Sequence, residues 1–463
     1  MLRLTRRSLL VAASVLAAVL AAWGLLAHRP QPADARGQQA EGQQPPAGNI
    51  VRQGFPARSF DENDMTSSDS GWEIEWEITQ PTNGSRSYNP PSSVLKIAAA
   101  KFMYKDKEGK PRWITVLRNL ELGESFVPYD PGFPQFRDVA SFAFHIVPAD
   151  ERLLGPACVA KGAILDSANP YMKNKVYKEV HDDGLRWLSD DGGDGPDRGR
   201  RGEKMLIWAV LYAANYRYIM EYGFADDGII TCRLGATGRN LRPLQRDESD
   251  CHLHIGCWMY QPDLGDPTNP DLGGPAHNVV QLVSRLPANP GVANGKFKID
   301  RRPFGTPPCT ELDKPALEGA AVWVPEEFTT LRVESAVRKN GNPIPQATSY
   351  DLVPIRYGSV RNIQPLYEFA NKDFWVTAGT TGPETRFSNV PSYVADPPRP
   401  IDRTPVTVWH NSPALHMHRA EDFAPNGVSN YPHVAITAWT GFMLKPRNLF
   451  DSTPLFNATT RGD

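Results

Sequence analysis

The chain has 463 residues, enough for a large buried core and for several domains. Its 50 Lys and Arg residues balance 52 Asp and Glu residues, so the formal net charge of -2 gives no electrostatic reason to expect binding to nucleic acid or to an anionic membrane. The sequence contains 43 prolines, 37 glycines and many aromatic residues, whereas long helical patterns are scarce. These features predict an all-β protein, a sandwich or barrel of many strands joined by turns, with few short helices.

Residues 1–35 are typical of a targeting segment. Three arginines precede an apolar run, and residues 33–35 form a small-x-small cleavage site. Residues 5–10 also fit a twin-arginine signal, so we expect export to the periplasm or to the exterior of the cell. The alternative is an uncleaved membrane anchor, because the apolar run approaches the length that spans a bilayer.

Residues 36–68 are expected to form a flexible linker without a core of its own, because they are rich in Gln, Pro, Gly and Asp. A different pattern begins at Gly71. From Trp72 to Ile78, apolar and polar residues alternate as they do in a half-buried strand. We therefore expect one large domain over residues 69–463.

The most informative stretch is the long apolar and aromatic run from Met205 to Tyr222. Residues 226–228, Asp-Asp-Gly, then give a turn signal, and residues 229–238 have the pattern of a returning strand. We expect a β-hairpin in which Tyr216 lies inside a strand and is buried.

Two histidines follow at alternate positions, His252 and His254. Residues i and i+2 of a strand point to the same face, so the two imidazoles would lie side by side as a pair of metal ligands. Imidazole suits copper or zinc, and a third ligand would come from a distant strand, where His416 and His418 form another same-face pair. On spacing alone, two such histidines are more often ordinary surface or core residues.

In this order, the residues resemble the catalytic domain of the quinone-containing copper amine oxidases, which is a large antiparallel β-sandwich. Residues 215–218, Asn-Tyr-Arg-Tyr, are similar to the cofactor motif Asn-Tyr-Asp/Glu-Tyr of that family. His252-Leu-His254 is similar to its pair of copper ligands, and the block around His416 resembles the motif of the third ligand. Further blocks in the same order are Gly71–Glu73, Leu120–Pro131, Lys173–Asn174 with His181–Trp187, Gly235–Gly238, Phe374–Thr377 and Gly441–Asp451.

The resemblance implies oxidative deamination of a primary amine by O2, with release of an aldehyde, ammonia and hydrogen peroxide. Copper would be bound by His252, His254 and His416. Tyr216 would be the residue that copper and oxygen convert to topaquinone, the cofactor that reacts with the amine. The resemblance also implies a homodimer.

Three further residues match functional positions of the family. Asp138 would be the base that removes a proton from the amine, and burial would raise its pKa toward the range useful for that task. Tyr129 would hydrogen-bond to the quinone and orient it, and Asn215 would pack beside it. The other residues of the base motif differ around Asp138, so an ordinary turn aspartate stays an alternative, as does a core tyrosine at position 129.

Departures from the family bear on activity. Arg217 replaces the acid after the cofactor tyrosine, and a positive charge near copper would favour an anionic quinone or an acidic group on the substrate. Gln261 and Pro262 interrupt the motif of a second, calcium-like metal site near Asp263, so that ion stays unassigned. The alternatives are a divergent copper-binding relative without ordinary activity, a relative acting on an unusual amine in a dedicated pathway, or a structural sandwich with incidental histidines.

Overall fold

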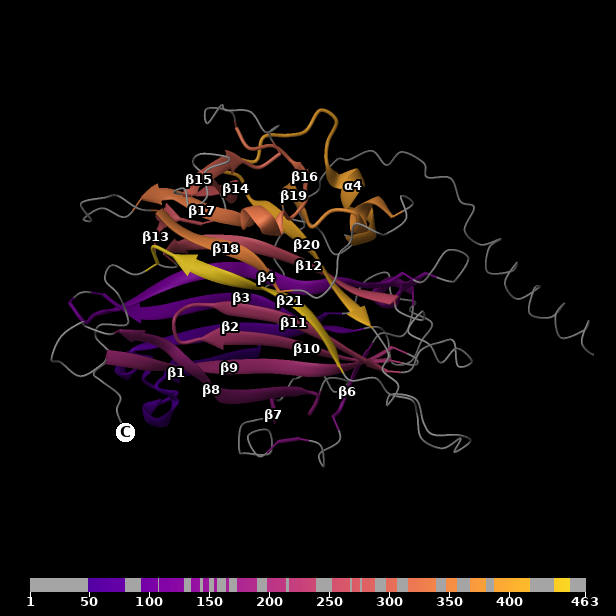
Figure 1. The fold of residues 1–463 in the computed structure, drawn as a ribbon. Coiled ribbons are helices and arrows are strands. Elements are labelled where there is room, and N and C mark those ends of the chain that lie inside the picture. The colour runs from indigo at the N-terminus through magenta and orange to yellow at the C-terminus, as the bar shows by residue number, and fades with distance from the viewer. Residues whose placement is uncertain are drawn as a thin grey trace, which may run out of the picture. The chain divides into compact units, whose positions relative to one another are not determined.

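Two antiparallel sheets hold most of the regular structure in the computed structural model (Figure 1). The structure describes residues 49–79, 93–106, 108–128, 135–141, 145–149, 154–155, 164–165, 173–189, 198–213, 216–238, 252–266, 269–274, 277–287, 297–305, 315–338, 347–355, 367–379, 387–416 and 437–449. These residues belong to one compact unit, residues 48–463. The predicted targeting segment lies outside the described residues.

Ten strands form the first sheet in the described part of the chain. They are β1 (Asn49–Phe55), β2 (Ser70–Thr79), β3 (Val94–Lys105), β4 (Pro111–Val127), β5 (Phe136–Arg137), β12 (His252–Asp266), β13 (Asn269–Gly273), β16 (Gly319–Ala321), β19 (Phe374–Ala378) and β20 (Val406–His416). The spatial order is β1-β2-β3-β4-β12-β20-β19-β16, with β5 paired to β4 and β13 to β12. Strand β12 therefore lies between β4 and β20, which are distant from it in sequence.

The second sheet has eleven strands within the described ranges. They are β6 (His145–Val147), β7 (Ile164–Leu165), β8 (Val176–Ser189), β9 (Arg198–Ala213), β10 (Tyr216–Ala225), β11 (Ile230–Gly238), β14 (Asn278–Pro287), β15 (Phe297–Pro303), β17 (Thr330–Arg338), β18 (Ala347–Ile355) and β21 (Ala438–Arg447). The order is β15-β14-β17-β18-β21-β11-β10-β9-β8-β7, with β6 paired to β9. Tyr216 to Tyr218 of the cofactor-like motif lie on β10, in the interior of this sheet.

Helices are short wherever the structure describes them. The α-helices are α2 (Asp138–Ser141) and α4 (Val390–Tyr393), and the 3-10 helices are η1 (Ala57–Ser59), η2 (Met65–Ser67), η7 (Pro325–Glu327), η9 (Glu368–Ala370) and η10 (Phe387–Asn389). None of the described helices has the length and apolar character needed to cross a membrane. The predicted all-β fold with few short helices is confirmed.

The two sheets pack face to face as layers of a sandwich (Figure 1). Trp72 on β2 is fully buried, and its Nε1 donates to the carbonyl oxygen of Ala225 at the end of β10 at 2.8 Å. Tyr222 on β10 donates from its hydroxyl to the carbonyl oxygen of Leu95 on β3 at 2.9 Å. Both aromatic side chains thus contribute apolar area to the core and satisfy their polar atoms across the layers.

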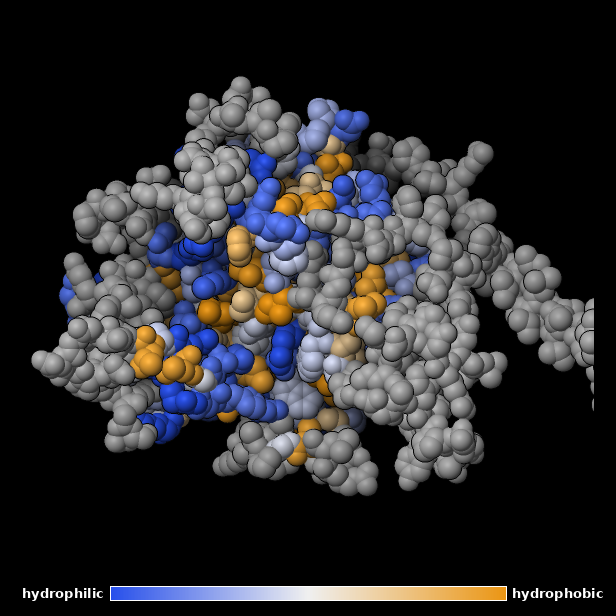
Figure 2. Space-filling view, in the orientation of Figure 1, coloured by the Kyte–Doolittle hydropathy of each residue, from blue (hydrophilic) through white to orange (hydrophobic). Residues whose placement is uncertain are grey.

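The outer surface carries the usual mixture of polar and apolar residues. Figure 2 shows small groups of apolar residues among hydrophilic ones on the face in view. The large apolar side chains that are exposed in the described residues are Ile50, Ile164, Leu185, Leu188, Phe328 and Ile355. Apolar side chains in this number are normal for a folded protein surface.

The linker prediction is wrong for residues 49–67. Strand β1 pairs with β2 from Asn49 opposite Trp76 to Phe55 opposite Ser70, and η1 and η2 follow it. Val51 and Phe55 are buried against the core. The polar composition averaged over residues 36–68 concealed these few apolar positions, which suffice for a strand at the edge of a sheet.

The apolar run from Met205 to Tyr222 forms two strands instead of one. Ala213 on β9 pairs with Tyr216 on β10, so the chain reverses direction between these residues and Tyr216 begins its strand. The run of 18 residues exceeds the usual length of a strand, and Asn215 is a turn-forming residue type, so both signals for this reversal were present. The second predicted reversal is confirmed, because Gly228, with φ of 85°, closes the turn between β10 and β11.

Candidate metal centre

Three histidines converge between the two sheets. His252 and His254 point to the same face of β12, and His416 on β20 lies directly opposite His252 in the register of the two strands. All three side chains are buried, with exposed fractions of 3% or less. One ring nitrogen of each lies within 4.8 Å of the others, and no other group of His, Cys, Asp or Glu in the described residues has this arrangement.

The converging ring nitrogens fit a transition-metal ion. His254 Nε2 lies 3.0 Å from His252 Nε2 and 3.3 Å from His416 Nδ1. Metal–nitrogen bonds of about 2.0–2.1 Å separate two ligand nitrogens by roughly 3 Å at ordinary bond angles. Imidazole binds copper, zinc, iron and nickel, so the donor set predicts the class of metal and not its identity.

Tyr216 from the opposite sheet points its hydroxyl at the same place. Its Oη lies 3.1 Å from His252 Nε2 and 2.9 Å from His416 Nδ1, and its ring is nearly fully buried. A metal ion bound by the three nitrogens would therefore be within reach of a phenol oxygen. The structure brings together the tyrosine and all three histidines that the sequence singled out.

A hydrogen-bonded chain links the histidines to a buried carboxyl group. Tyr218, two residues after Tyr216 on the same face of β10, donates from its hydroxyl to Asp138 Oδ2 at 2.8 Å. The same hydroxyl lies 2.9 Å from His254 Nδ1. With Nε2 of His254 directed at the other ring nitrogens, Nδ1–H donates to Tyr218, whose hydroxyl proton goes to Asp138. Such a chain fixes the orientation and tautomer of the imidazole.

Asp138 is the first residue of α2 and is 8% exposed. Burial raises the pKa of its carboxyl group to about 7, and the hydrogen bond from Tyr218 opposes this shift. A carboxyl group with this pKa exchanges a proton readily near neutral pH. The predicted role of Asp138 as a base is compatible with this placement and stays a prediction.

A second buried carboxyl group, Glu124 on β4, was not predicted from the sequence. Its Oε1 accepts hydrogen bonds from the backbone N–H of Ser125 at 3.0 Å and of Val139 at 2.8 Å. Burial raises its pKa to about 8, and the nearby Asp138 adds to the shift. The available signal was a single acid in an otherwise uncharged strand end, Gly123–Val127.

Two predicted residues, Tyr129 and Asn215, lie outside the described residues. Their proposed roles beside the cofactor stay predictions. Asp263, near the possible second metal site, is buried and accepts a hydrogen bond from the guanidinium of Arg118. An arginine thus neutralises the one acid that suggested a calcium-like ion.

The expectation that the charge of Arg217 acts near the metal is wrong. Strand alternation directs its side chain to the opposite face from Tyr216, where it is exposed. Its guanidinium lies 4.1 Å from the centroid of the Tyr212 ring, and its Nη1 donates to the carbonyl oxygen of Tyr216 at 3.2 Å.

Replacing Arg217 by Ala is therefore expected to change the affinity of the three-histidine site for a transition-metal ion less than about threefold, because exposed substitutions usually change energies by no more than ~0.5 kcal/mol. Metal titration of the metal-free protein and of the variant checks this. A loss of tenfold or more would show that Arg217 acts on the site through the backbone of Tyr216.

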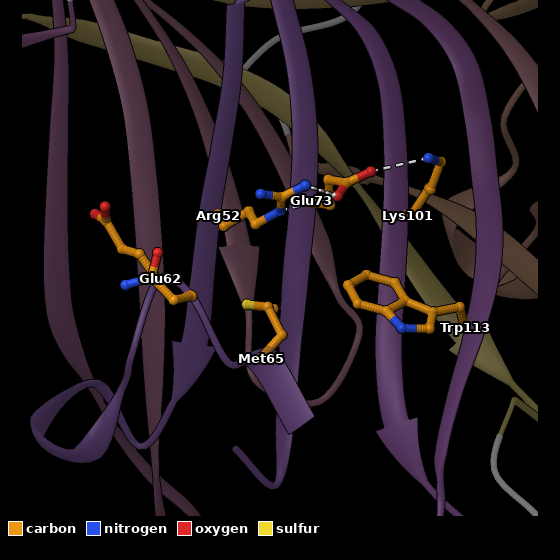
Figure 3. Close-up of a pocket in the computed structure, with 7 residues that line it drawn as sticks. Arg52, Glu62, Met65, Glu73, Lys101 and Trp113 are labelled. Atoms are coloured by element: carbon orange, nitrogen blue, oxygen red, sulfur yellow. Dashed lines mark hydrogen bonds and ion pairs between the residues drawn. The ribbon is translucent and has the colours of Figure 1, made fainter. Parts of the chain in front are cut away.

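A surface pocket of about 580 Å³ lies apart from the histidines, on β1 to β4 and the segment between β1 and β2 (Figure 3). Three of its charged residues pair with one another, since Glu73 binds both Arg52 at 2.9 Å and Lys101 at 2.8 Å. Trp113 and Met65 form apolar parts of the wall. None of the site residues predicted from the sequence lines this pocket.

The fold and the site together define a class of protein, a β-sandwich with a buried three-histidine centre and an adjacent tyrosine. No family model matches the chain. The primary amine oxidase of Arthrobacter sp. (strain P1) is 23% identical over 380 residues, which cover 74% of this chain and 55% of that protein. Copper amine oxidase 1 of Aspergillus niger is 23% identical over 384 residues, 73% of this chain and 53% of the relative.

Solved structures show the same fold. The copper-containing benzylamine oxidase of Hansenula polymorpha aligns with a TM-score of 0.59 and 17% identity, over 93% of this chain and 65% of that one. The amine oxidase of Aspergillus nidulans aligns with a TM-score of 0.59 and 15% identity, over 94% of this chain and 57% of that one. The chain is thus similar in sequence to curated copper amine oxidases and has the fold of solved ones. It spans about half the length of the curated relatives that it matches.

Proposed function

We propose that the protein is a copper- and topaquinone-dependent oxidase that converts a primary amine and O2 to an aldehyde, ammonia and hydrogen peroxide. One observation carries the proposal: the Tyr216 hydroxyl lies 3.1 and 2.9 Å from ring nitrogens of two of the three converging histidines. The names of the relatives, primary amine oxidase and copper amine oxidase, support the choice of copper and of an amine.

The metal ligands in this proposal are His252 Nε2, His254 Nε2 and His416 Nδ1. Copper and the quinone made from Tyr216 would supply the redox and carbonyl chemistry that protein side chains lack. The chain itself contributes orientation, because His254 is fixed by Tyr218 and the Tyr216 ring is enclosed between the sheets. The burial of these residues also excludes bulk water from the site.

Asp138 moves the proton in the proposed reaction. As a carboxylate it accepts a proton from the α-carbon of the bound amine, and the hydrogen bond from Tyr218 to Oδ2 holds the carboxylate in place. Its raised pKa, about 7, makes it a stronger base than an ordinary aspartate. A pKa near the working pH also lets it release that proton again.

The proposal is tested by adding copper in air to metal-free protein and titrating the product with phenylhydrazine, which reacts with quinones. We expect a coloured adduct in the wild type and none in Tyr216→Phe, because the phenol oxygen next to the ligands has been removed. Tyr222→Phe is the matched control, since Tyr222 lies on the same strand and hydrogen-bonds to the backbone of Leu95. Peroxide release with a panel of primary amines then addresses the substrate.

A copper-loaded wild type without a quinone would overturn the proposal. That outcome would leave the divergent copper-binding relative as the better description of the protein. An adduct that persists in Tyr216→Phe would place the quinone at another residue.

We also propose, from the sequence, that the protein is exported and forms a homodimer. The arginine-rich start and the cleavage pattern of residues 1–35 support export, and the family resemblance supports the dimer. N-terminal sequencing of the secreted or periplasmic protein and sedimentation of the purified protein check the two points. An intact N-terminus in the membrane fraction would favour the anchor, and a monomer at micromolar concentration would contradict the dimer.

A further inference from the structure

We propose that Glu124 is the positioning residue of Asp138: its carboxyl group anchors the start of α2 and so sets the contact between Asp138 and Tyr218. This inference rests on the proposed function, in which Asp138 is the base. Glu124 has no place in the candidate metal centre itself, because its hydrogen bonds go to the backbone of Ser125 and Val139.

The segment that carries Asp138 has little regular structure to hold it. Strand β5 has two residues, which pair with Phe126 and Val127 at the end of β4, and it leads directly into α2, which has four. The first N–H groups of a helix have no partner within the helix. Glu124 supplies an acceptor for one of them, the N–H of Val139, the residue next to Asp138.

Glu124 reaches this amide from the face of β4 that also carries Phe126. Neighbouring residues of a strand alternate, so Glu124 and Ser125 face opposite sides of β4. Glu124 pairs in register with Cys257, and its neighbour in the apolar cluster on that face is Phe126. The charged groups near it are Asp138, which raises its pKa, and Arg137, which lowers it.

These surroundings favour a neutral Glu124. With a pKa of about 8, the group is mostly protonated at pH 7, so α2 is held by an acceptor oxygen and not by a charge. Glutamine offers the same oxygen at the same reach and is also neutral. Leucine keeps the volume but leaves the N–H of Val139 without its acceptor, and aspartate is too short to reach it.

The position of Asp138 matters because proton transfer depends steeply on distance. Misplacing a catalytic group by about 1 Å costs up to roughly 100-fold in rate. The distance of 2.8 Å between Tyr218 Oη and Asp138 Oδ2 shows whether Asp138 is in place. Without the hydrogen bond from Val139 to Glu124, this distance would change, whereas the three histidines and Tyr216 would keep their positions on their own strands.

The test compares Glu124→Gln, Glu124→Leu and Glu124→Asp as copper-loaded proteins, with benzylamine and α,α-dideuterated benzylamine as probes. We expect Glu124→Gln to keep kcat within about threefold of the wild type. We expect Glu124→Leu and Glu124→Asp to lower kcat by roughly 10- to 100-fold with an unchanged KM, copper content and phenylhydrazine titre. Their deuterium isotope effect on kcat should rise, because removal of the α-proton becomes the slow step. Glu124→Asp tests the proposal by itself if Glu124→Leu does not fold.

A purely structural role would give a different result. A smaller folded fraction would lower kcat and the phenylhydrazine titre together, with an unchanged isotope effect, and this would overturn the proposal. Crystal structures of the wild type and the variants give a readout that needs no turnover. If Glu124→Leu or Glu124→Asp keeps the contact between Asp138 and Tyr218, the positioning role is wrong. If the wild type makes no quinone, the proposed function fails while the structures still decide the role of Glu124.

Discussion

Replacing His416 by Ala is expected to weaken copper binding by more than about 100-fold and to abolish formation of the quinone. Loss of partners that merely orient a ligand already costs about 10- to 100-fold in metal affinity, and this substitution removes a ligand itself. His416 also comes from a different strand than His252 and His254, so the two remaining imidazoles would no longer enclose the ion. Copper titration of the metal-free protein, followed by the phenylhydrazine assay, measures both effects.

His181→Ala is the matched control, because His181 is an exposed histidine on β8 that contacts Glu179 at 2.5 Å, outside the cluster. It should bind copper as the wild type does. A His416→Ala protein that binds copper at full affinity and still processes Tyr216 would refute the assignment of the third ligand. His254→Ala should resemble His416→Ala, since all three ring nitrogens belong to one group.

Replacing Asp138 by Asn is expected to reduce kcat by about 10²- to 10⁴-fold, the range typical of a lost general base. Asn keeps the size of the side chain and can still accept the hydrogen bond from Tyr218. Copper content and the phenylhydrazine titre should therefore stay near those of the wild type. A variant with more than a tenth of the wild-type kcat would show that another group removes the proton.

The pH profile of the wild type should reveal the same carboxyl group. The base acts in its ionised form, so activity should rise as the pH increases through about 7, the raised pKa of buried Asp138, and not near 4, where ordinary aspartates ionise. Rate measurements between pH 5 and 9 locate this limb. A rising limb below pH 5 would contradict the effect of burial on Asp138.

The same shift affects stability with a defined sign. The pKa of Asp138 is about 7 in the folded protein and near 4 in the unfolded chain, so the folded state binds this proton more tightly. The free energy of unfolding is therefore highest below about pH 4, where both states are protonated, and it falls as the pH rises from 4 through 7. An asparagine side chain in its place would carry no charge at any pH. The metal-free Asp138→Asn protein should therefore gain a few kcal/mol of stability relative to the wild type between pH 5 and 9 in denaturant unfolding.

Much of the site could be predicted because its residues lie in local patterns. The alternation of His252 and His254 shows that their side chains share a face once they lie on a strand. The turn at Gly228 was visible in the sequence, and it returns the chain beside the strand that carries Tyr216. The pairing of β12 with β20 was not visible, because no local signal specifies which distant strand lies opposite His252. Spacing had offered both His416 and His418 as the third ligand, and the family resemblance selected His416.

The errors in the sequence-based predictions share a physical cause. Tertiary structure decides which way a side chain points and which strand pairs at the edge of a sheet. Arg217 follows Tyr216 in sequence and was expected at the metal, but the pleat of β10 turns it to the other face. Tyr218 and Glu124 were overlooked because their partners, Asp138 and Val139, are brought to them by the packing of α2. Strand β1 was assigned to a linker because its few apolar residues gain their burial only from β2.

The division of the site between the layers has a consequence for how the mature protein would be made. The histidines come from one sheet and Tyr216 from the other, so no single layer holds both reactants of the proposed self-processing. The cofactor could then arise only in molecules whose layers have already docked in register. The fraction of molecules that contain the quinone would then equal the fraction whose two sheets had packed correctly. Molecules that misfolded before oxidation would contain no quinone and would not absorb visible light.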